Sequence, residues 1–402
     1  MSALRRDLQS QGEAISGNDA SAPELSVVMP CLNEAETLKA CIEKVQRAFR
    51  EHGIAGEIIL ADNGSTDGSP GIAARMGARV VVVESKGYGS ALRGGIAAAR
   101  GKYIIMGDAD DSYDFTQIPL FLEKLRAGFD LVMGNRFKGG IKCGAMPPLH
   151  RYLGIPVLTA IARLLFGSPL NDNHCGLRGF RKSAFLKMGL RATGWEFGSE
   201  MILRANLLAM RITEIPITLS PDGRSRPPHL RTWHAGWEHL RLMLLYSPRW
   251  LFLYPGSVLV AVGLLTGLWL MPGPRRVADV TFNVHTLLYA AAAVLLGFQA
   301  IAFSAFTKVF GVSQGLLPQD PRLDRALRWA SLEAGLVVGG LLVLAGLGGS
   351  VYALGLWGSR QFGPMDATNT LRIVIPAVVC LTLGFEIVLS SFFLSVLRMA
   401  RQ

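Results

Sequence analysis

Four long apolar stretches in the last third of the chain restrict its possible folds more than any other feature. The first, 251–271, contains no charged residue, and about 20 such residues are enough for a helix to cross a bilayer. Three more follow at about 284–307, 334–357 and 373–397. The first 250 residues carry most of the charge. We therefore expect a soluble domain followed by an all-α membrane domain of four transmembrane helices at 251–402.

The positive charges around these stretches predict their orientation. The second connection and the tail hold more of them than the other two connections: Lys308, Arg322, Arg325, Arg328, Arg398 and Arg401 against Arg275, Arg276, Arg360 and Arg372. Cytoplasmic loops are enriched in Lys and Arg, so we expect both termini and the catalytic domain in the cytoplasm. Residues 1–23 are polar without an apolar core. They predict a disordered arm rather than a signal peptide or a span.

Short apolar runs alternate with helical patterns from Leu25 onward. The predicted strands are 25–29, 57–61, 79–83, 103–106 and 130–133. Alternating strands and helices indicate right-handed βαβ units and a parallel sheet. Residues 24–228 are therefore predicted to form a Rossmann-like α/β domain that binds a nucleotide.

Polar residues follow several of these strands. Asp62 ends the second strand, Lys86 and its neighbouring glycines follow the third, and Asp108 and Asp110 follow the fourth. The carboxyl ends of parallel strands form the ligand-binding edge of such sheets. Asp108 and Asp110 are two residues apart and point to one side, where they suit Mg²⁺ or Mn²⁺ shared with substrate phosphates. Taken alone, this acidic stretch could equally cap the next helix, and the neighbouring polar loops favour the metal site.

Two further residues of this acidic stretch are treated separately. We expect Asp114 to cap the helix near 116–127. A role for Asp111 as a third metal ligand stays open.

Several classes of protein are disfavoured. No G-x-G-x-x-G fingerprint follows the first strand, and no P-loop motif is present. The net charge of +11 fits anionic lipid or phosphate-bearing substrates. No Lys/Arg run or recognition motif suggests nucleic acid. The five cysteines include no C-x-x-C pair, so we expect no disulfide framework.

Five ordered motifs at 25–250 resemble those of the family 2 (GT-A fold) glycosyltransferases. They are Val27-Val28-Met29-Pro30, Asn33-Glu34, Asp62–Gly68, the D-x-D at 108–110, and Asn135-Arg136-Phe137 with Gly176–Arg181. The two segments of the fifth motif, 135–137 and 176–181, resemble the dolichyl-phosphate mannose/glucose synthase branch. The resemblance implies a GT-A domain with a mixed or parallel sheet. It also implies inverting transfer of glucose or mannose from UDP-glucose or GDP-mannose to a polyprenyl phosphate, with Mg²⁺ or Mn²⁺.

The resemblance also implies roles for individual residues. It implies nucleotide binding by Pro30, Asn33, Glu34, Asp62, Asn63, Lys86, Gly87, Asp108 and Ala109. Asp108 and Asp110 would hold the metal. Catalytic roles fall on Asp110, Arg136, Arg151 and Arg224, and an acceptor-phosphate clamp on Arg136, Arg151 and Arg226. The basic flap reads Gly-Arg-Ser-Arg at 223–226 where the family has Gly-x-Ser-Lys, so the choice between its two arginines is open.

The chemistry favours a phosphate acceptor. An alcohol nucleophile needs a general base, whereas a phosphate monoester, with a second pKa of about 6, is already mostly dianionic at neutral pH. It needs positive clamps, which arginine provides bidentately. We therefore interpret Glu200 as a sugar contact or helix cap, and His174 as structural.

Two stretches, 150–166 and 229–250, combine apolar residues with arginine, and the second adds three tryptophans. Such amphipathic segments are typical of membrane interfaces, although packed helices would read the same. Within the spans, Gly335-x-x-x-Gly339 predicts a close helix contact, and Glu386 must face protein or water.

Two other functions stay open. Tyr246-Ser247-Pro248-Arg249-Trp250 has the spacing of the Q-x-x-R-W motif of processive polysaccharide synthases but lacks its Gln. A non-catalytic membrane protein that binds lipid or nucleotide sugar is the second alternative. The sequence is compatible with an oligomer.

Overall fold

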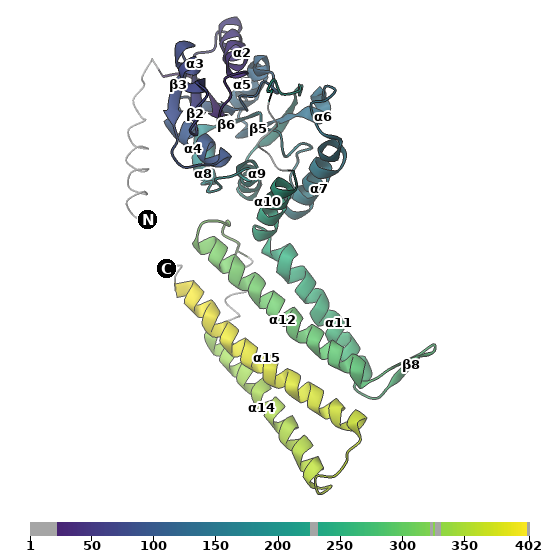
Figure 1. The fold of residues 1–402 in the computed structure, drawn as a ribbon. Coiled ribbons are helices and arrows are strands. Elements are labelled where there is room, and N and C mark those ends of the chain that lie inside the picture. Colours follow the sequence, from purple (N-terminus) through teal and green to yellow (C-terminus); the bar gives the residue numbers. More distant parts are fainter. Residues whose placement is uncertain (1–21, 226–231, 322–324, 326–330, 400–402) are drawn as a thin grey trace. The chain divides into compact units, whose positions relative to one another are not determined.

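The computed structural model describes residues 22–225, 232–321, 325 and 331–399. The chain divides into two compact units, Met1–Leu242 and Met243–Gln402 (Figure 1). The arm predicted at 1–23 lies, except for its last two residues, outside the described residues.

A seven-stranded sheet forms the centre of the first unit, in the order β3-β2-β1-β4-β6-β5-β7. The strands are β1 Leu25–Cys31, β2 Gly56–Asp62, β3 Arg79–Val82, β4 Tyr103–Met106, β5 Leu131–Asn135, β6 Arg178–Arg181 and β7 Ile212–Pro216. β1 pairs in parallel with β2 and β4, whereas β6 is antiparallel to both β4 and β5. The sheet is therefore mixed, and its first four strands in chain order are the parallel half that the sequence predicts.

Helices connect these strands. They are α2 Leu38–Glu51, α3 Ser69–Arg75, α4 Tyr88–Ala98, α5 Ile118–Arg126, α6 Arg136–Gly139, α7 Ile155–Phe166, α8 Lys182–Met188, α9 Phe197–Leu207 and α10 Thr232–Leu245. Short helical turns η1 Phe115–Gln117 and η2 His150–Gly154 precede α5 and α7. Helix α2 begins at Leu38, after the loop at 32–37 that follows β1.

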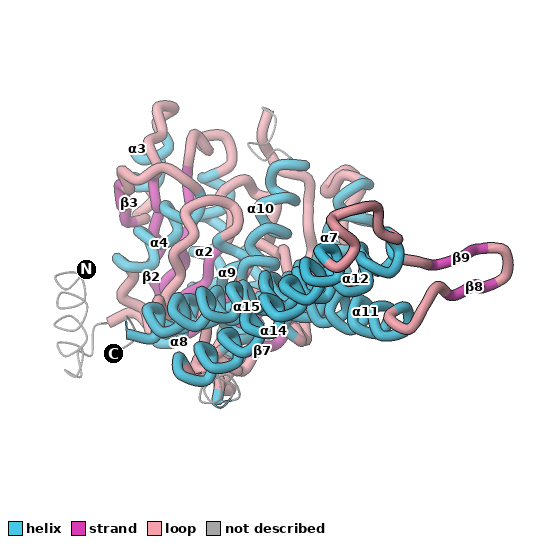
Figure 2. The backbone as a smooth tube through the Cα atoms, turned by 90° about the horizontal axis from the view of Figure 1, so that it is seen from below, coloured by secondary structure: helices cyan, strands magenta, loops and turns pink. Residues whose placement is uncertain are grey.

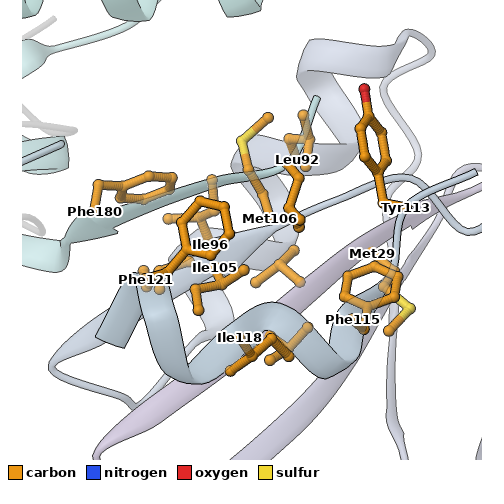
Figure 3. Close-up of a cluster of buried hydrophobic side chains, with 14 of the residues drawn as sticks. Met29, Leu92, Ile96, Ile105, Met106, Tyr113, Phe115, Ile118, Phe121 and Phe180 are labelled. Atoms are coloured by element: carbon orange, nitrogen blue, oxygen red, sulfur yellow. The ribbon is translucent and has the colours of Figure 1, made fainter. Parts of the chain in front are cut away.

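Helices cover both faces of the sheet. α4 packs on one face through Gly95, where a Cβ atom would lie 2.6 Å from Val28 and 2.9 Å from Ala61. Met29, the next residue of β1, points to the opposite face, where Figure 3 shows it beside Phe115. Large, fully buried side chains such as Phe115, Phe121 and Phe180 fill this core. Two packed layers thus hold the strand ends in place.

The sequence pattern did not predict β6 and β7. β6 reads Arg-Gly-Phe-Arg, which has neither the apolar run nor the alternation that signals a strand. It forms because its backbone pairs with β4 on one side and with β5 on the other, and both of these strands lie far from β6 in the sequence.

The second unit contains four helices that are long and apolar enough to cross a membrane: Arg249–Leu270, Val284–Ser313, Leu332–Gly358 and Ala367–Met399. The first comprises η3 Arg249–Leu253 and α11 Tyr254–Leu270, and the others are α12, α14 and α15. A hairpin of β8 Arg275–Val277 and β9 Val280–Phe282 connects α11 to α12 (Figure 2). The four predicted spans are all helices: the first and third differ from the prediction by one or two residues at each end, and the second and fourth are longer by several residues.

Glycines bring these helices into close contact in pairs. A Cβ atom at Gly339 of α14 would lie 2.7 Å from the carbonyl oxygen of Gly384 in α15. The contact predicted for Gly335 and Gly339 is therefore confirmed. Gln299 of α12 donates a hydrogen bond of 2.6 Å to Glu386 of α15, so Glu386 faces protein.

Candidate active site

A cavity of about 1090 Å³ opens within the first unit, at the carboxyl ends of β1 and β4. Ten of the residues predicted from the sequence line it: Pro30, Glu34, Asn63, Lys86, Gly87, Asp108, Ala109, Asp110, Arg136 and Arg224. Asn33, Asp62 and Arg151 are not among the lining residues. Arg226 lies outside the described residues.

Asn33 and Asp62 hold the loops after β1 and β2 together. The Asp62 carboxylate accepts hydrogen bonds from the backbone N–H groups of Gly64 and Ser65, at 3.1 and 3.2 Å. Asn33 adopts a left-handed backbone conformation with φ of 61°, and its Oδ1 accepts from the Thr66 N–H at 2.7 Å. In this structure both side chains order the loop that follows β2, and Asn33 joins it to the loop that follows β1.

Asn63 organises the loop after β3 in the same way. Its side-chain amide donates to the carbonyls of Val83 and Ser85, both at 2.8 Å. Its Oδ1 accepts from the Gly87 N–H at 2.9 Å, and its backbone carbonyl accepts from Lys86 Nζ at 2.7 Å. Lys86 is thus placed at the cavity, beside the loop that follows β2.

Glu34, Asp108 and Asp110 form the carboxylate side of the cavity. Asp108 Oδ1 accepts a hydrogen bond of 2.9 Å from the Tyr88 hydroxyl. Its Oδ2 faces the backbone of Gly176, where a Cβ atom would approach it to 2.6 Å. Burial and the neighbouring Asp110 charge raise the pKa of Asp108 to about 7. The pair concentrates negative charge that a cation would relieve.

Arg224 supplies positive charge to this side. Its guanidinium lies 2.8 Å from Asp110 Oδ2 and 3.1 Å from Glu34 Oε1, and it also pairs with Asp222 at 3.0 Å. The flap arginine therefore binds the carboxylates directly. A cationic group already occupies the place where a divalent ion would meet Asp110.

The other two acidic residues of this stretch have separate roles. Asp111, with φ of 63°, pairs with Lys44 at 2.7 Å and is not among the lining residues. Asp114 accepts from the Thr116 N–H at 3.0 Å and caps the turn η1. The predicted cap is confirmed.

The donor set fits Mg²⁺ or Mn²⁺. Among the residues that the structure describes, no group of three or more His, Cys, Asp or Glu side chains could hold a metal ion. Two carboxylates, with water and substrate phosphates completing the shell, are the usual arrangement for Mg²⁺ at phosphate-bearing substrates. The guanidinium on Asp110 demonstrates that this position accepts a cation.

Arg136 and Arg178 form the arginine side of the cavity. Both are buried, at 7% and 3% relative exposure. Nε and Nη2 of Arg136 donate to the two carboxylate oxygens of the buried Asp172, at 2.7 and 2.8 Å. The predicted clamp residue Arg136 is therefore already paired bidentately. Arg151, its predicted partner, packs over the Tyr152 ring at 5.5 Å.

Several lining residues were not predicted from the sequence as parts of the site. Tyr88, which binds Asp108, stacks on Trp195 with ring centroids 4.6 Å apart. Arg178 lies within the motif Gly176–Arg181, but the motif does not indicate where its side chain points. His174, which we interpreted as structural, lines the cavity beside His239.

An apolar wall completes the cavity. Its residues come from η2, α7, α10 and the residue before η2: Leu149, Leu153, Val157, Leu158, Ile161, Trp233, Trp237 and Leu240. Trp233 and Trp237 are 80% and 56% exposed. The polar centre of the cavity thus borders on a hydrophobic surface.

The Glu200 side chain makes structural contacts to the backbone. It is buried, and its carboxylate accepts from the backbone N–H groups of Arg191 and Ala192, both at 2.8 Å. It is not among the lining residues. The sequence left sugar contact or capping open, and this structure gives Glu200 contacts to the turn before α9.

Comparisons with known proteins agree with this architecture. Residues 26–189 match the model of glycosyl transferase family 2, and residues 305–398 match the model of the glycosyltransferase family 2 C-terminal transmembrane region. The low-salt glycan biosynthesis hexosyltransferase Agl6 of Haloferax volcanii is 37% identical over 396 residues, covering 96% of this chain and 93% of that protein. The dolichyl-phosphate hexose transferase of the same organism is 31% identical over 48% of this chain and 82% of its own length.

Among solved structures, glucosyl-3-phosphoglycerate synthase from Mycobacterium tuberculosis in complex with phosphoglyceric acid is similar at a TM-score of 0.45. The two sequences are 22% identical, and the matched region covers 56% of this chain and 81% of the synthase chain.

The family of this chain follows from its similarity to Agl6 over nearly its whole length and from the two matching family models. One model covers strands β1 to β6 with the carboxylate and arginine sides, and the other covers the end of α12 and nearly all of α14 and α15. The chain belongs to glycosyltransferase family 2.

Proposed function

We propose that this protein transfers a hexose from a UDP- or GDP-sugar to a polyprenyl phosphate at the cytoplasmic face of a membrane. The observation that carries the proposal is a single cavity that joins three unlike surfaces. Acidic groups, buried arginines and an apolar wall all line it. A nucleotide diphosphate, a phosphate acceptor and a lipid chain need these three surfaces respectively.

The nucleotide sugar would bind on the carboxylate side. Asp108 and Asp110 would hold a divalent cation, which as a Lewis acid would stabilise the leaving diphosphate. Lys86 and Arg224 lie at the same side and would bind diphosphate oxygens once Arg224 leaves Asp110. Charge from arginine and lysine at the leaving group contributes to catalysis because the donors are already oriented.

The acceptor would attack from the opposite side. One phosphate oxygen forms a bond to the anomeric carbon while the bond from that carbon to the nucleotide diphosphate breaks, and the electron pair leaves with the diphosphate. This single displacement passes through an oxocarbenium-like state and inverts the anomeric centre. The carboxylates among the described lining residues are Glu34, Asp108 and Asp110, all assigned above to the donor. A phosphate dianion suits this site because it needs no general base.

The relatives support this choice of substrates. One is named a hexosyltransferase, and another is named a dolichyl-phosphate hexose transferase. The four apolar helices would anchor the enzyme where a polyprenyl phosphate resides. The segment of η2 and α7, which exposes Tyr152, and the helix α10, which exposes Trp233 and Trp237, would lie at the interface of the bilayer.

The test is transfer of label to lipid. The purified full chain is incubated with Mn²⁺, undecaprenyl phosphate, and radiolabelled UDP-glucose or GDP-mannose, with undecaprenol as the uncharged control. We expect labelled lipid from the phosphate alone. No labelled lipid with any common nucleotide sugar would refute the proposal, and a long labelled polysaccharide would identify a processive synthase instead.

A further inference from the structure

Arg178 differs from the other cations of the cavity in how its charge is balanced. The Lys and Arg residues that line the cavity in the described part of the chain are Lys86, Arg136, Arg178 and Arg224. Arg136 and Arg224 form ion pairs with carboxylates, and Lys86 is exposed to water. Arg178 is buried and forms no ion pair with any carboxylate of the described residues.

Backbone carbonyls hold the Arg178 side chain in place. Its Nε donates to the carbonyl oxygen of Cys175 at 2.7 Å, and its Nη1 donates to that of Gly198. A Cβ atom at Gly198 would lie only 2.6 Å from Nη2, so the guanidinium rests directly on the first turn of α9. Carbonyl dipoles orient the group, and no carboxylate of the described residues forms an ion pair with it. A buried charge of this kind is costly unless a counter-ion completes the site.

His239 lies next to this guanidinium. Its Nδ1 is 2.8 Å from the hydroxyl of Ser199, the residue that follows the Gly198 carbonyl bound to Arg178. Burial, and then the Arg178 charge, lower the pKa of His239 to about 4, so the ring is neutral at pH 7. In the tautomer in which the Ser199 hydroxyl donates to Nδ1, the single ring proton is on Nε2, where it can be donated to an acceptor.

His174 supports the ring of His239 from behind. The two rings meet edge to face, with centroids 4.8 Å apart. Nε2 of His174 is buried and has no hydrogen-bond partner among the described residues. Two neutral rings and one guanidinium without an ion pair therefore gather on one wall of the cavity, which offers hydrogen-bond donors and positive charge.

The same wall continues into the hydrophobic surface. His239 is part of α10, between the lining residues Trp237 and Leu240. A ligand whose anionic head met Arg178 and His239 would therefore have apolar side chains beside it. That combination selects an amphiphilic phosphate over a free phosphate ion.

We propose that Arg178 and His239 form the subsite that binds the phosphate of the lipid acceptor. The inference rests on the proposed function and deepens it. It assigns the acceptor phosphate to these residues in place of Arg136, which Asp172 already binds, and Arg151, which is not among the lining residues. Asp108 Oδ2 faces Gly176, two residues before Arg178. The subsite thus adjoins the donor site.

The test separates acceptor binding from donor binding. In the full chain in detergent, affinities are measured for undecaprenyl phosphate, for undecaprenol, and for the sugar nucleotide that the wild-type protein binds. Arg178→Met should weaken the binding of undecaprenyl phosphate about ten- to hundredfold, the range for a charge-assisted hydrogen bond at a buried site. It should leave undecaprenol and the sugar nucleotide within about twofold. Arg178→Lys should recover part of the loss because it restores the charge.

Arg181→Met is the matched control. Arg181 ends the same strand and also donates to backbone carbonyls, those of Phe129 and Leu125 at 3.2 Å, but it is not among the lining residues. Its acceptor affinity should equal that of the wild-type protein. If Arg178→Met does not fold, as judged by thermal unfolding, His239→Gln replaces it, with an expected loss of about threefold to tenfold.

The outcomes distinguish the two proposals. Unchanged acceptor affinity in the folded variants, or an equal loss of donor affinity, would overturn the subsite while transfer by the wild-type protein still supported the function. A wild-type protein that neither binds nor glycosylates undecaprenyl phosphate would refute both.

Discussion

The two sides of the cavity use arginine in opposite ways. On the carboxylate side, Arg224 is surrounded by Glu34, Asp110 and Asp222, and its charge is consumed locally. On the arginine side, Arg178 meets only carbonyl oxygens, and its charge remains available. Residue type alone therefore does not define a phosphate clamp. The partners decide whether an arginine neutralises a site or recruits an anion.

The largest effect is expected on the carboxylate side. Asp110→Ala removes a carboxylate that would hold the metal and should lower turnover at least 100- to 1,000-fold, since preorganised charge stabilisation contributes on this scale. The comparison variant is Asp111→Ala, whose carboxylate pairs with Lys44 away from the lining and should keep most activity. Turnover is followed by lipid labelling, with thermal unfolding to verify the fold. Wild-type turnover in Asp110→Ala would show that the acidic stretch only caps the helix that follows it.

On the arginine side, the expected effect is a loss of stability. Asp172→Asn leaves the buried guanidinium of Arg136 without its counter-ion, which typically costs about 3–5 kcal/mol. Thermal unfolding of the full chain should therefore show a clearly lower Tm. Glu51→Gln serves as the reference, because it breaks only the exposed pair with Arg47 and exposed pairs contribute about 0–1 kcal/mol. Equal Tm values for the two variants would contradict a structural role for the Arg136–Asp172 pair.

A smaller effect, on the affinity for Mn²⁺, tests the role of Arg224. Because its guanidinium binds Asp110, it should compete with a divalent cation in the nucleotide-free protein. Arg224→Gln should therefore tighten Mn²⁺ binding by about three- to tenfold, the equivalent of one charge-assisted hydrogen bond. Isothermal titration without nucleotide measures this, and the exposed Arg50→Gln should leave the affinity unchanged. Weaker Mn²⁺ binding in Arg224→Gln would show that the arginine supports metal binding and does not compete with it.

The smallest effect concerns pH. The pKa of His239 is lowered from its ordinary value of 6.5 to about 4 in the folded protein. The unfolded chain therefore binds more protons between these two values, and the stability that the neutral ring contributes is lost as the pH falls from 6.5 towards 4. In His239→Gln, the decrease in Tm over this range should be smaller by a few degrees, because each unit of pKa shift that is lost corresponds to about 1.4 kcal/mol. Identical pH profiles would indicate that the ring is solvated.

The sequence predicted one side of the cavity better than the other. The carboxylate side is built from loops that directly follow parallel strands, so Asp108 and Asp110 could be placed from strand periodicity and spacing. Asp114 as a cap follows from the same local reasoning. These predictions needed only contacts between residues close in the chain or ends of adjacent parallel strands.

The arginine side depends on contacts that no local pattern contains. Asp172 meets Arg136 across 36 positions, and β6, which carries Arg178, has no strand signature of its own. Tyr88 and Trp195 stack across a still longer separation in the sequence. Tertiary packing determines which arginine is paired and which is not, and the sequence could therefore offer candidates but not choose among them.

The hydrogen bond between Gln299 and Glu386 fixes the register of two apolar helices. A carboxyl group in hydrocarbon needs a donor, and successive positions on a helix are separated by about 100° of rotation and 1.5 Å of rise. Sliding α15 past α12 by a single residue would turn Glu386 away from Gln299 and expose it to lipid. Smooth leucine and valine surfaces alone would tolerate such a shift. One polar pair therefore selects a single alignment from many helix packings that would otherwise be nearly equal in energy.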